Sequence, residues 1–282
     1  MAGKAAPPQR YLAPACVAAV LVFAGCGEAG TAPAALAPGD GGSDTGIEPG
    51  TPALYLDRII EQVDPHGANP MREGYRARLE NCLGSDAPTT ALSREDEERL
   101  GTRRLRTWRK GDRYAFHDQA WVIEVPAEIT RDTMCAFAVR ETGKQGFIEG
   151  GRSIEIDLET GERLEGNGDP SIVMTGRDVD VAQEARDALA IGMSGPTPRT
   201  VAGLPCDEWR TRSGSAVCVW SGGTRWGMTS VAPAEVDLNT LQHFSLFVLE
   251  VTPPEGREGL RLSTVEARTG VLPEESELAP GR

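Results

Sequence analysis

Histidine is scarce in this sequence, with three in 282 residues, and only 5% of the residues are aromatic. No G-x-S-x-G, H-E-x-x-H or Walker A pattern occurs, so the local signatures of an α/β-hydrolase, a zinc protease and a P-loop enzyme are missing. A histidine-dependent site would have to use His66, His117 or His243. We therefore expect a noncatalytic protein with no metal and no organic cofactor, and we keep a hydrolase assembled only in the fold as the alternative.

The chain also lacks an apolar run long enough for a membrane-spanning helix. Residues 11–24 are almost wholly apolar or small, about 14 residues against the roughly 20 that cross a bilayer. Lys4 and Arg10 precede this run, and no acidic residue does. A basic head before a short apolar run is typical of an export signal.

The export signal ends at Phe23-Ala24-Gly25-Cys26. This stretch resembles the lipobox of bacterial lipoprotein precursors, although Phe23 stands where Leu, Val or Ile is usual. The resemblance implies that residues 1–25 are removed and that Cys26 carries diacylglycerol, because the lipid needs a nucleophilic thiolate. The alternative is an ordinary secretory cleavage near Gly25, with Cys26 incidental.

Residues 26–52 predict a flexible tether behind the lipidated cysteine. Residues 27–52 hold seven Gly, four Pro and no aromatic residue, too little apolar surface for a packed core. A flexible segment of this length reaches about 28 Å. The tether would hold the protein at a bacterial membrane, in the cell envelope.

Acidic residues outnumber basic ones. Loss of residues 1–25 leaves 27 basic and 42 acidic residues, a net charge of −15. Such a chain lacks the basic footprint that nucleic acids require. Seven basic residues nevertheless cluster between positions 99 and 113. This run could dock an acidic partner or a lipid headgroup, but neutralisation by the acids at Glu95 to Glu98 and by the overall negative charge is favoured.

Four cysteines follow Cys26, and no two of them form a C-x-x-C pair. An even number in an exported chain predicts two disulfides. A hairpin turning symmetrically around Arg212 would place Cys206 opposite Cys218. The remaining bridge would join Cys82 to Cys135.

The pattern along the chain predicts an α+β fold, with N-terminal helices packed on a largely antiparallel, twisted sheet. Helices are expected from Thr51-Pro52 to Asp64, from Asn69 to Gly84, from Ser93, and from Asp180 to Leu189. Period-two and β-rich runs predict strands at residues 114–125, 134–140, 153–158, 206–210, 216–220, 225–230, 243–251 and 260–267. The globular domain would span residues 53–272, with a possible internal boundary at 195–199 and an acidic tail at 273–282.

Two groups of polar residues are compatible with chemistry. His117 precedes Asp118, but neighbours on a strand point to opposite faces, so we expect a strand histidine rather than a catalytic pair. Acidic residues crowd positions 157–169 in a Gly-rich stretch. These acids suit either solvated hairpin turns or calcium, and their spacing does not fit an EF-hand, so turns are favoured.

The segment from Ala202 to Trp209, followed by a hairpin, is similar to strands of LolA-like lipid-carrier half-barrels. The resemblance implies a binding protein and assigns no ligand residues. We therefore hypothesise a membrane-tethered envelope lipoprotein that binds an envelope partner or an apolar ligand. A structural or assembly role without a pocket is the remaining alternative, and the sequence leaves the oligomeric state open.

Overall fold

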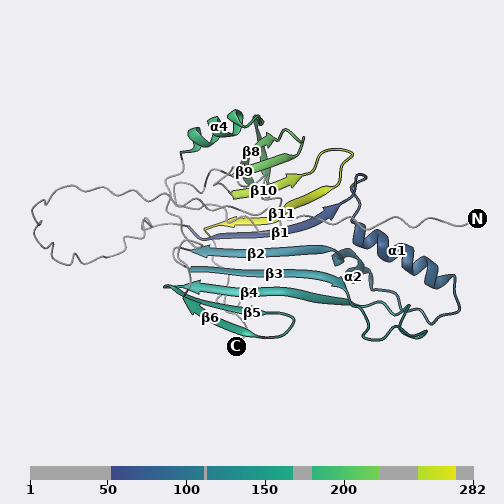
Figure 1. Ribbon diagram of the computed structural model, residues 1–282. Helices are drawn as coiled ribbons and strands as arrows, with labels where there is room; N and C mark the ends of the chain where they lie inside the picture. The colour runs from purple at the N-terminus through teal and green to yellow at the C-terminus, as the bar shows by residue number, and fades with distance from the viewer. Residues whose placement is uncertain (1–51, 111–112, 168–179, 221, 223–246, 271–282) are drawn as a thin grey trace, which may run out of the picture. The chain divides into compact units, whose positions relative to one another are not determined.

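The computed structural model describes residues 52–110, 113–167, 180–220, 222 and 247–270. These residues form one antiparallel sheet of 11 strands (Figure 1). The strands are β1 Leu54–Val63, β2 Thr102–Lys110, β3 Arg113–Ile123, β4 Val139–Glu149, β5 Arg152–Asp157, β6 Arg163–Asn167, β7 Ser194–Val201, β8 Leu204–Arg210, β9 Ala216–Trp220, β10 Phe247–Thr252 and β11 Gly259–Thr269. The helices are α1 Pro70–Leu83, α2 Arg94–Arg99 and α4 Val181–Ala190.

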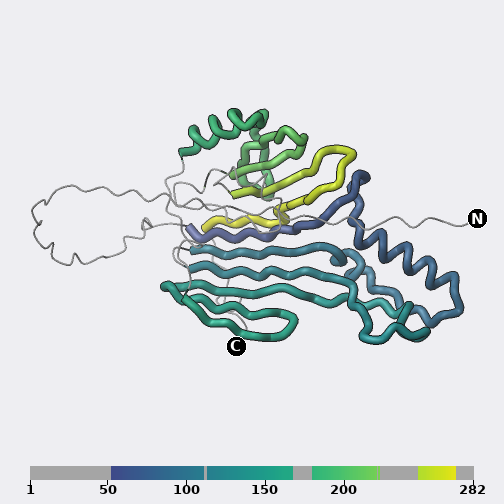
Figure 2. The backbone as a smooth tube through the Cα atoms, viewed as in Figure 1, coloured from purple at the N-terminus to yellow at the C-terminus, as the bar shows by residue number. Residues whose placement is uncertain are grey.

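The sheet consists of two meanders joined at its middle. Its strand order is β6-β5-β4-β3-β2-β1-β11-β10-β9-β8-β7, so the first strand lies between the second and the last. Figure 2 shows the purple start of the described chain running beside its yellow end. Leu54 pairs with Arg109 on one side and with Thr269 on the other. Contacts between the first and last described strands therefore hold the centre of the sheet together.

The predicted α+β class is wrong, because strands dominate the described residues and the expected first helix is strand β1. Leu54, Tyr55 and Leu56 are 3%, 7% and 0% exposed, so this strand is buried on both faces. A strand with two buried faces loses the alternation of apolar and polar residues that identifies strands in a sequence. Helices α1 and α2 lie beside the strand ends instead of forming a layer across the sheet (Figure 1).

Side-chain caps begin each helix. The Oδ1 atom of Asn69 accepts hydrogen bonds from the backbone N–H groups of Met71 and Arg72, and its Nδ2 donates to the carbonyl of Gly101 at 3.0 Å. Ser93 and Asp180 cap α2 and α4 in the same way. Such a cap contributes about 1 kcal/mol. Asn69 therefore also ties the start of α1 to the chain entering β2.

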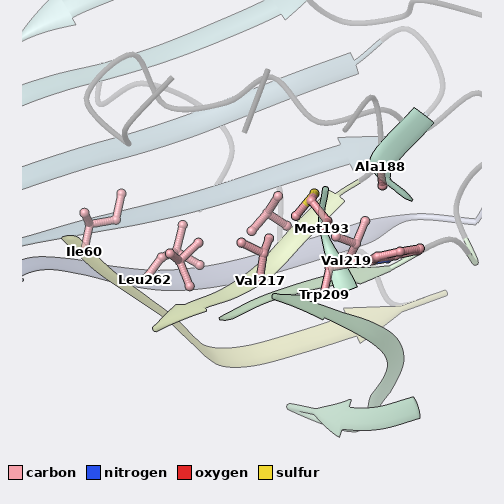
Figure 3. Packing of buried hydrophobic residues seen from close by; sticks show 9 residues of the cluster. Ile60, Ala188, Met193, Trp209, Val217, Val219 and Leu262 are labelled. Carbon is pink, nitrogen blue, oxygen red and sulfur yellow. The ribbon is translucent and has the colours of Figure 1, made fainter. Parts of the chain in front are cut away.

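Strand β9 is buried on both faces. Val217 and Val219 pack in one cluster with Trp209, to which α4 and its following turn add Ala188 and Met193 (Figure 3). Cys218 and Trp220, on the opposite face, pack with Leu56 and Leu249 of the central strands in a second cluster. Burying each large apolar side chain stabilises the fold by about 1.5–3 kcal/mol. These two clusters fix the β7–β11 half of the sheet.

The β8–β9 hairpin departs from the predicted register. Arg210 pairs with Ala216 and Glu208 with Cys218, so the turn is centred on Ser213 and not on Arg212. Gly214, at φ +95°, supplies the left-handed backbone that this loop needs. Cys206 and Cys218 are consequently diagonal neighbours on one face, with Cα atoms 5.6 Å apart. That separation lies within the range that a disulfide tolerates.

Candidate functional site

A cleft of about 450 Å³ opens at one end of the central strands. Residues far apart in the chain line it: the turn after β1 at residues 63–67, Arg199 of β7, Glu208 and Arg210 of β8, Gly214 and Ala216 of the β8–β9 hairpin, the β10–β11 turn at residues 252–257, and Arg261 of β11. Its volume lies within the range of small-molecule binding sites. No local pattern in the sequence indicated this site, because its walls lie far apart along the chain.

Ion pairs hold the arginines of one wall. Arg199 Nη1 donates to Glu208 Oε2 at 2.5 Å and to Glu250 Oε1 at 2.9 Å, and these carboxylates raise the pKa of Arg199. Arg210 Nη2 donates to Glu208 Oε1 at 3.3 Å. Arg261 of β11, which also lines the cleft, donates through Nη1 to Glu61 Oε1 at 3.3 Å. Each of these three arginines is therefore paired with a carboxylate.

Arg257 differs from the other arginines of the cleft. It lies exposed in the β10–β11 turn, next to Pro253 and Pro254 in the lining, and its side chain has no hydrogen-bond or ion-pair partner among the described residues. Its guanidinium is available to an acidic group from another molecule.

Asp64 and His66 line the cleft but do not form an acid–base pair. Asp64 Oδ1 accepts hydrogen bonds from the backbone N–H groups of Ala68 and His66, both at 2.8 Å. These bonds, chiefly that from Ala68, hold the pKa of Asp64 below its usual value. Asp64 thus shapes the turn between β1 and α1.

His117 lies on the sheet face with Arg106 and Trp108. Its Nδ1 is 3.3 Å from Arg106 Nη2, and its ring centroid is 4.9 Å from that of Trp108. Burial, with a smaller effect from Arg106, lowers the pKa of His117 to about 4. Asp118 points to the other face and binds Arg103 through Nε at 2.5 Å. His117 and Asp118 therefore do not meet, as the alternation of side chains on a strand requires.

The acidic stretch forms turns where the structure describes it. Asp157 Oδ1 accepts hydrogen bonds from the backbone N–H groups of Glu159 and Thr160 at 2.9 and 2.8 Å, closing the β5–β6 turn. No group of three or more His, Cys, Asp or Glu residues within the described ranges is placed to hold a metal ion. Asp169 lies outside the described residues.

The basic run forms strand β2 and its surroundings. Arg104 binds the buried carboxylate of Asp57 through Nε at 2.9 Å and Nη2 at 2.5 Å, while Arg106 binds Gln119 at 2.8 Å. Arg99, in α2, pairs with Glu95. Much of this run is therefore occupied by contacts inside the protein and is not a free basic patch.

Two disulfides occur at the expected pairs. Cys82 joins Cys135, with Cα atoms 5.8 Å apart, and Cys206 joins Cys218. Disulfides form in oxidising compartments, which is in keeping with an envelope location. The other sequence candidates, Cys26 and His243, lie outside the described residues. Among the helices that the structure describes, none has the length and hydropathy to cross a membrane.

Comparisons with known proteins give structural matches only. No family model matches the sequence, and no curated protein matches it. An uncharacterized conserved protein from Thermus thermophilus is 8% identical, with a TM-score of 0.30, over 81% of this chain and 83% of its own. MucB of Pseudomonas aeruginosa, in its complex with MucA, is 12% identical, with a TM-score of 0.31, over 85% of this chain.

A second structure, of MucB with MucA(peri), is also 12% identical and gives a TM-score of 0.27 over 85% of this chain. The chain spans less than two thirds of these two MucB-complex chains, 58% and 57%. All three TM-scores are below 0.5, so we base the proposed function on this chain's own residues. The segment that resembles LolA-like carriers, residues 202–209, forms the β7–β8 turn and most of β8.

Proposed function

We propose that this protein is a bacterial envelope lipoprotein, anchored by diacylglycerol on Cys26, whose domain binds a partner protein in the cleft at the end of the central strands. The leader at residues 1–25, the lipobox and the Gly- and Pro-rich tether support the anchor. The two disulfides support an oxidising compartment.

The observation that carries the binding role is the cleft with Arg257 at its edge. Most of its polar groups are already paired, so they present a preformed surface of alternating charge. Such a surface suits the polar side chains of a protein segment better than an acyl chain, because burying paired charges under apolar groups removes their hydration without replacing it. The unpartnered guanidinium of Arg257 specifies a carboxylate on the segment that binds.

Photo-crosslinking in the native envelope tests this role. The crosslinker p-benzoylphenylalanine replaces Glu255, which lines the cleft, and in a matched control it replaces Leu164, which is 57% exposed on β6. We expect a discrete crosslinked partner from position 255 only. Adding Arg257→Glu should reduce that product about fivefold or more, and Arg163→Glu should not. Equal crosslinking from both positions, or a product indifferent to Arg257→Glu, contradicts the proposal.

The anchor is tested separately. Intact mass of the protein from the membrane fraction should correspond to a chain that starts at Cys26 and carries acyl groups. Cys26→Ala should release the protein from the membrane and abolish the added mass. An unmodified soluble chain cut near Gly25 would overturn the anchor and leave the cleft proposal standing.

A further inference from the structure

The turn between β10 and β11 places two opposite charges at the edge of the cleft. The backbone N–H of Arg257 donates to the carbonyl of Pro254 at 3.2 Å, which closes a β-turn. Gly256, at φ +71°, supplies the left-handed backbone that a type II turn requires at its third position. Glu255 and Arg257 flank this glycine, and both residues are exposed and line the cleft. The closed turn therefore fixes how far apart an acid and a base enter the site.

These two side chains are free, whereas the other carboxylates and guanidiniums of the lining have partners inside the protein. The occupied groups are Arg199 and Arg210, which bind Glu208, Arg261, which binds Glu61, and Asp64, which accepts backbone N–H groups. Among the described residues neither Glu255 nor Arg257 has a hydrogen-bond or ion-pair partner, and the two do not pair with each other. Another molecule can bind both charges without first breaking an ion pair.

The spacing of the two charges and the size of the cleft favour an extended segment as the occupant. Two positions along a chain span at most about 7 Å, so this is the greatest separation of the Glu255 and Arg257 backbones. In an extended segment, side chains two positions apart share one face and start about 6.6 Å from each other. A helix with its side chains is about 10–12 Å wide, whereas the cleft has a volume of about 450 Å³. A short extended segment therefore matches both measures.

We propose that the partner segment in the cleft is extended and carries an acidic and a basic side chain two positions apart, the acidic one for Arg257 and the basic one for Glu255. This inference rests on the proposed function, in which the cleft binds a segment of a protein. A uniformly acidic segment would bring a like charge to Glu255, and a uniformly basic segment would bring one to Arg257. The turn thus selects a segment of mixed charge.

Photo-crosslinking from position 66 in the native envelope tests the charge pattern. The crosslinker p-benzoylphenylalanine replaces His66, which is exposed and lines the cleft from the turn after β1, so the β10–β11 turn keeps its own side chains. Glu255→Lys should reduce the crosslinked product about threefold or more, because it replaces an attraction to the partner's basic group by a repulsion. If the partner offers a carboxylate alone, the added cation strengthens binding and the product increases instead.

The matched control is Glu258→Lys. Glu258 is exposed and follows Arg257 directly, but it does not line the cleft. Its replacement changes the net charge by the same amount as Glu255→Lys and should leave the product unchanged. Because these positions are exposed, the variants should keep the wild-type Tm, which separates weaker binding from unfolding.

The double variant Glu255→Lys/Arg257→Glu exchanges the two charges and keeps the wild-type net charge. It should give no more product than either single variant, because both charges of the partner then meet like charges. Wild-type product from the double variant, or unchanged or increased product from Glu255→Lys, overturns the mixed-charge inference and leaves the proposed function standing. No product from position 66 with Glu255 and Arg257 intact overturns the proposed function and this inference together.

Discussion

The two disulfides should stabilise the protein unequally, because they close loops of different length. Cys82 and Cys135 are 53 residues apart, and Cys206 and Cys218 are 12 apart. In the chain-entropy model, loops of these lengths contribute about 4.1 and about 2.8 kcal/mol, a difference of about 1.3 kcal/mol. All four cysteines are at least 92% buried, so replacing either pair by alanine removes similar packing.

The assay is equilibrium unfolding of the mature chain in urea, followed by circular dichroism, for Cys82→Ala/Cys135→Ala and for Cys206→Ala/Cys218→Ala. The first variant should lose more free energy of unfolding than the second, and fully reduced wild-type protein should be less stable than either. An equal loss, or a larger loss from the 12-residue loop, would refute the chain-entropy reasoning and assign the stabilisation to local packing.

Three further predictions concern the β1–β4 half of the sheet. Because the pKa of His117 is lowered to about 4, only the unfolded chain gains a proton on this histidine as the pH falls from about 6.5 to about 4. The free energy of unfolding should therefore decrease as the pH falls through this window. In urea unfolding at pH 7 and at pH 4.5, His117→Gln should make this decrease smaller. An unchanged pH slope in the variant contradicts this. Arg104→Met leaves the buried carboxylate of Asp57 without its ion-pair partner and should lower the free energy of unfolding by about 3 kcal/mol. Arg113→Met, which removes an exposed ion pair with Glu149, should lower it by less than about 1 kcal/mol. Equal losses in urea unfolding would contradict the role of the Arg104–Asp57 pair. Gly143→Ala places a Cβ against the Asp118 carbonyl at φ +130°, so it should lower Tm more than Gly150→Ala, whose Cβ meets open space. The reverse order would contradict the close approach of β4 to β3 at Gly143.

Local features of the sequence are the ones that matched the structure. The N-cap residues Asn69, Ser93 and Asp180 act on backbone groups within three positions, so a short window contains all the information needed. Strands β8 and β9 were likewise expected from their β-rich runs, but the turn between them was misplaced by one position. The sequence predicts Arg212 as its centre, whereas the observed centre is Ser213 and Gly214 supplies the left-handed backbone of the loop.

Long-range contacts were beyond a reading of the sequence. The apolar spacing of Leu56, Ile59, Ile60 and Val63 fits a helix as well as a doubly buried strand, and only the partners β2 and β11 decide between them. The sequence of β2 does not predict a strand, because it is rich in arginine. A strand can form there because partners far away in the chain, such as Asp57, 47 positions from Arg104, pair with these charges. The cleft is missed for the same reason, since its lining comes from segments far apart in the chain.

The central position of β1 determines when the fold can be completed. While the chain is being synthesised or threaded across a membrane, β1 can pair with β2 long before Gly259–Thr269 is available. Until then β1 has an unpaired edge, with Leu54, Leu56 and Ile60 awaiting their cross-strand neighbours, and such an edge invites pairing with other chains. A sheet whose closing ladder joins residues about 200 positions apart has a high contact order and folds slowly. The interval before β11 arrives is therefore when this protein most needs protection by a chaperone.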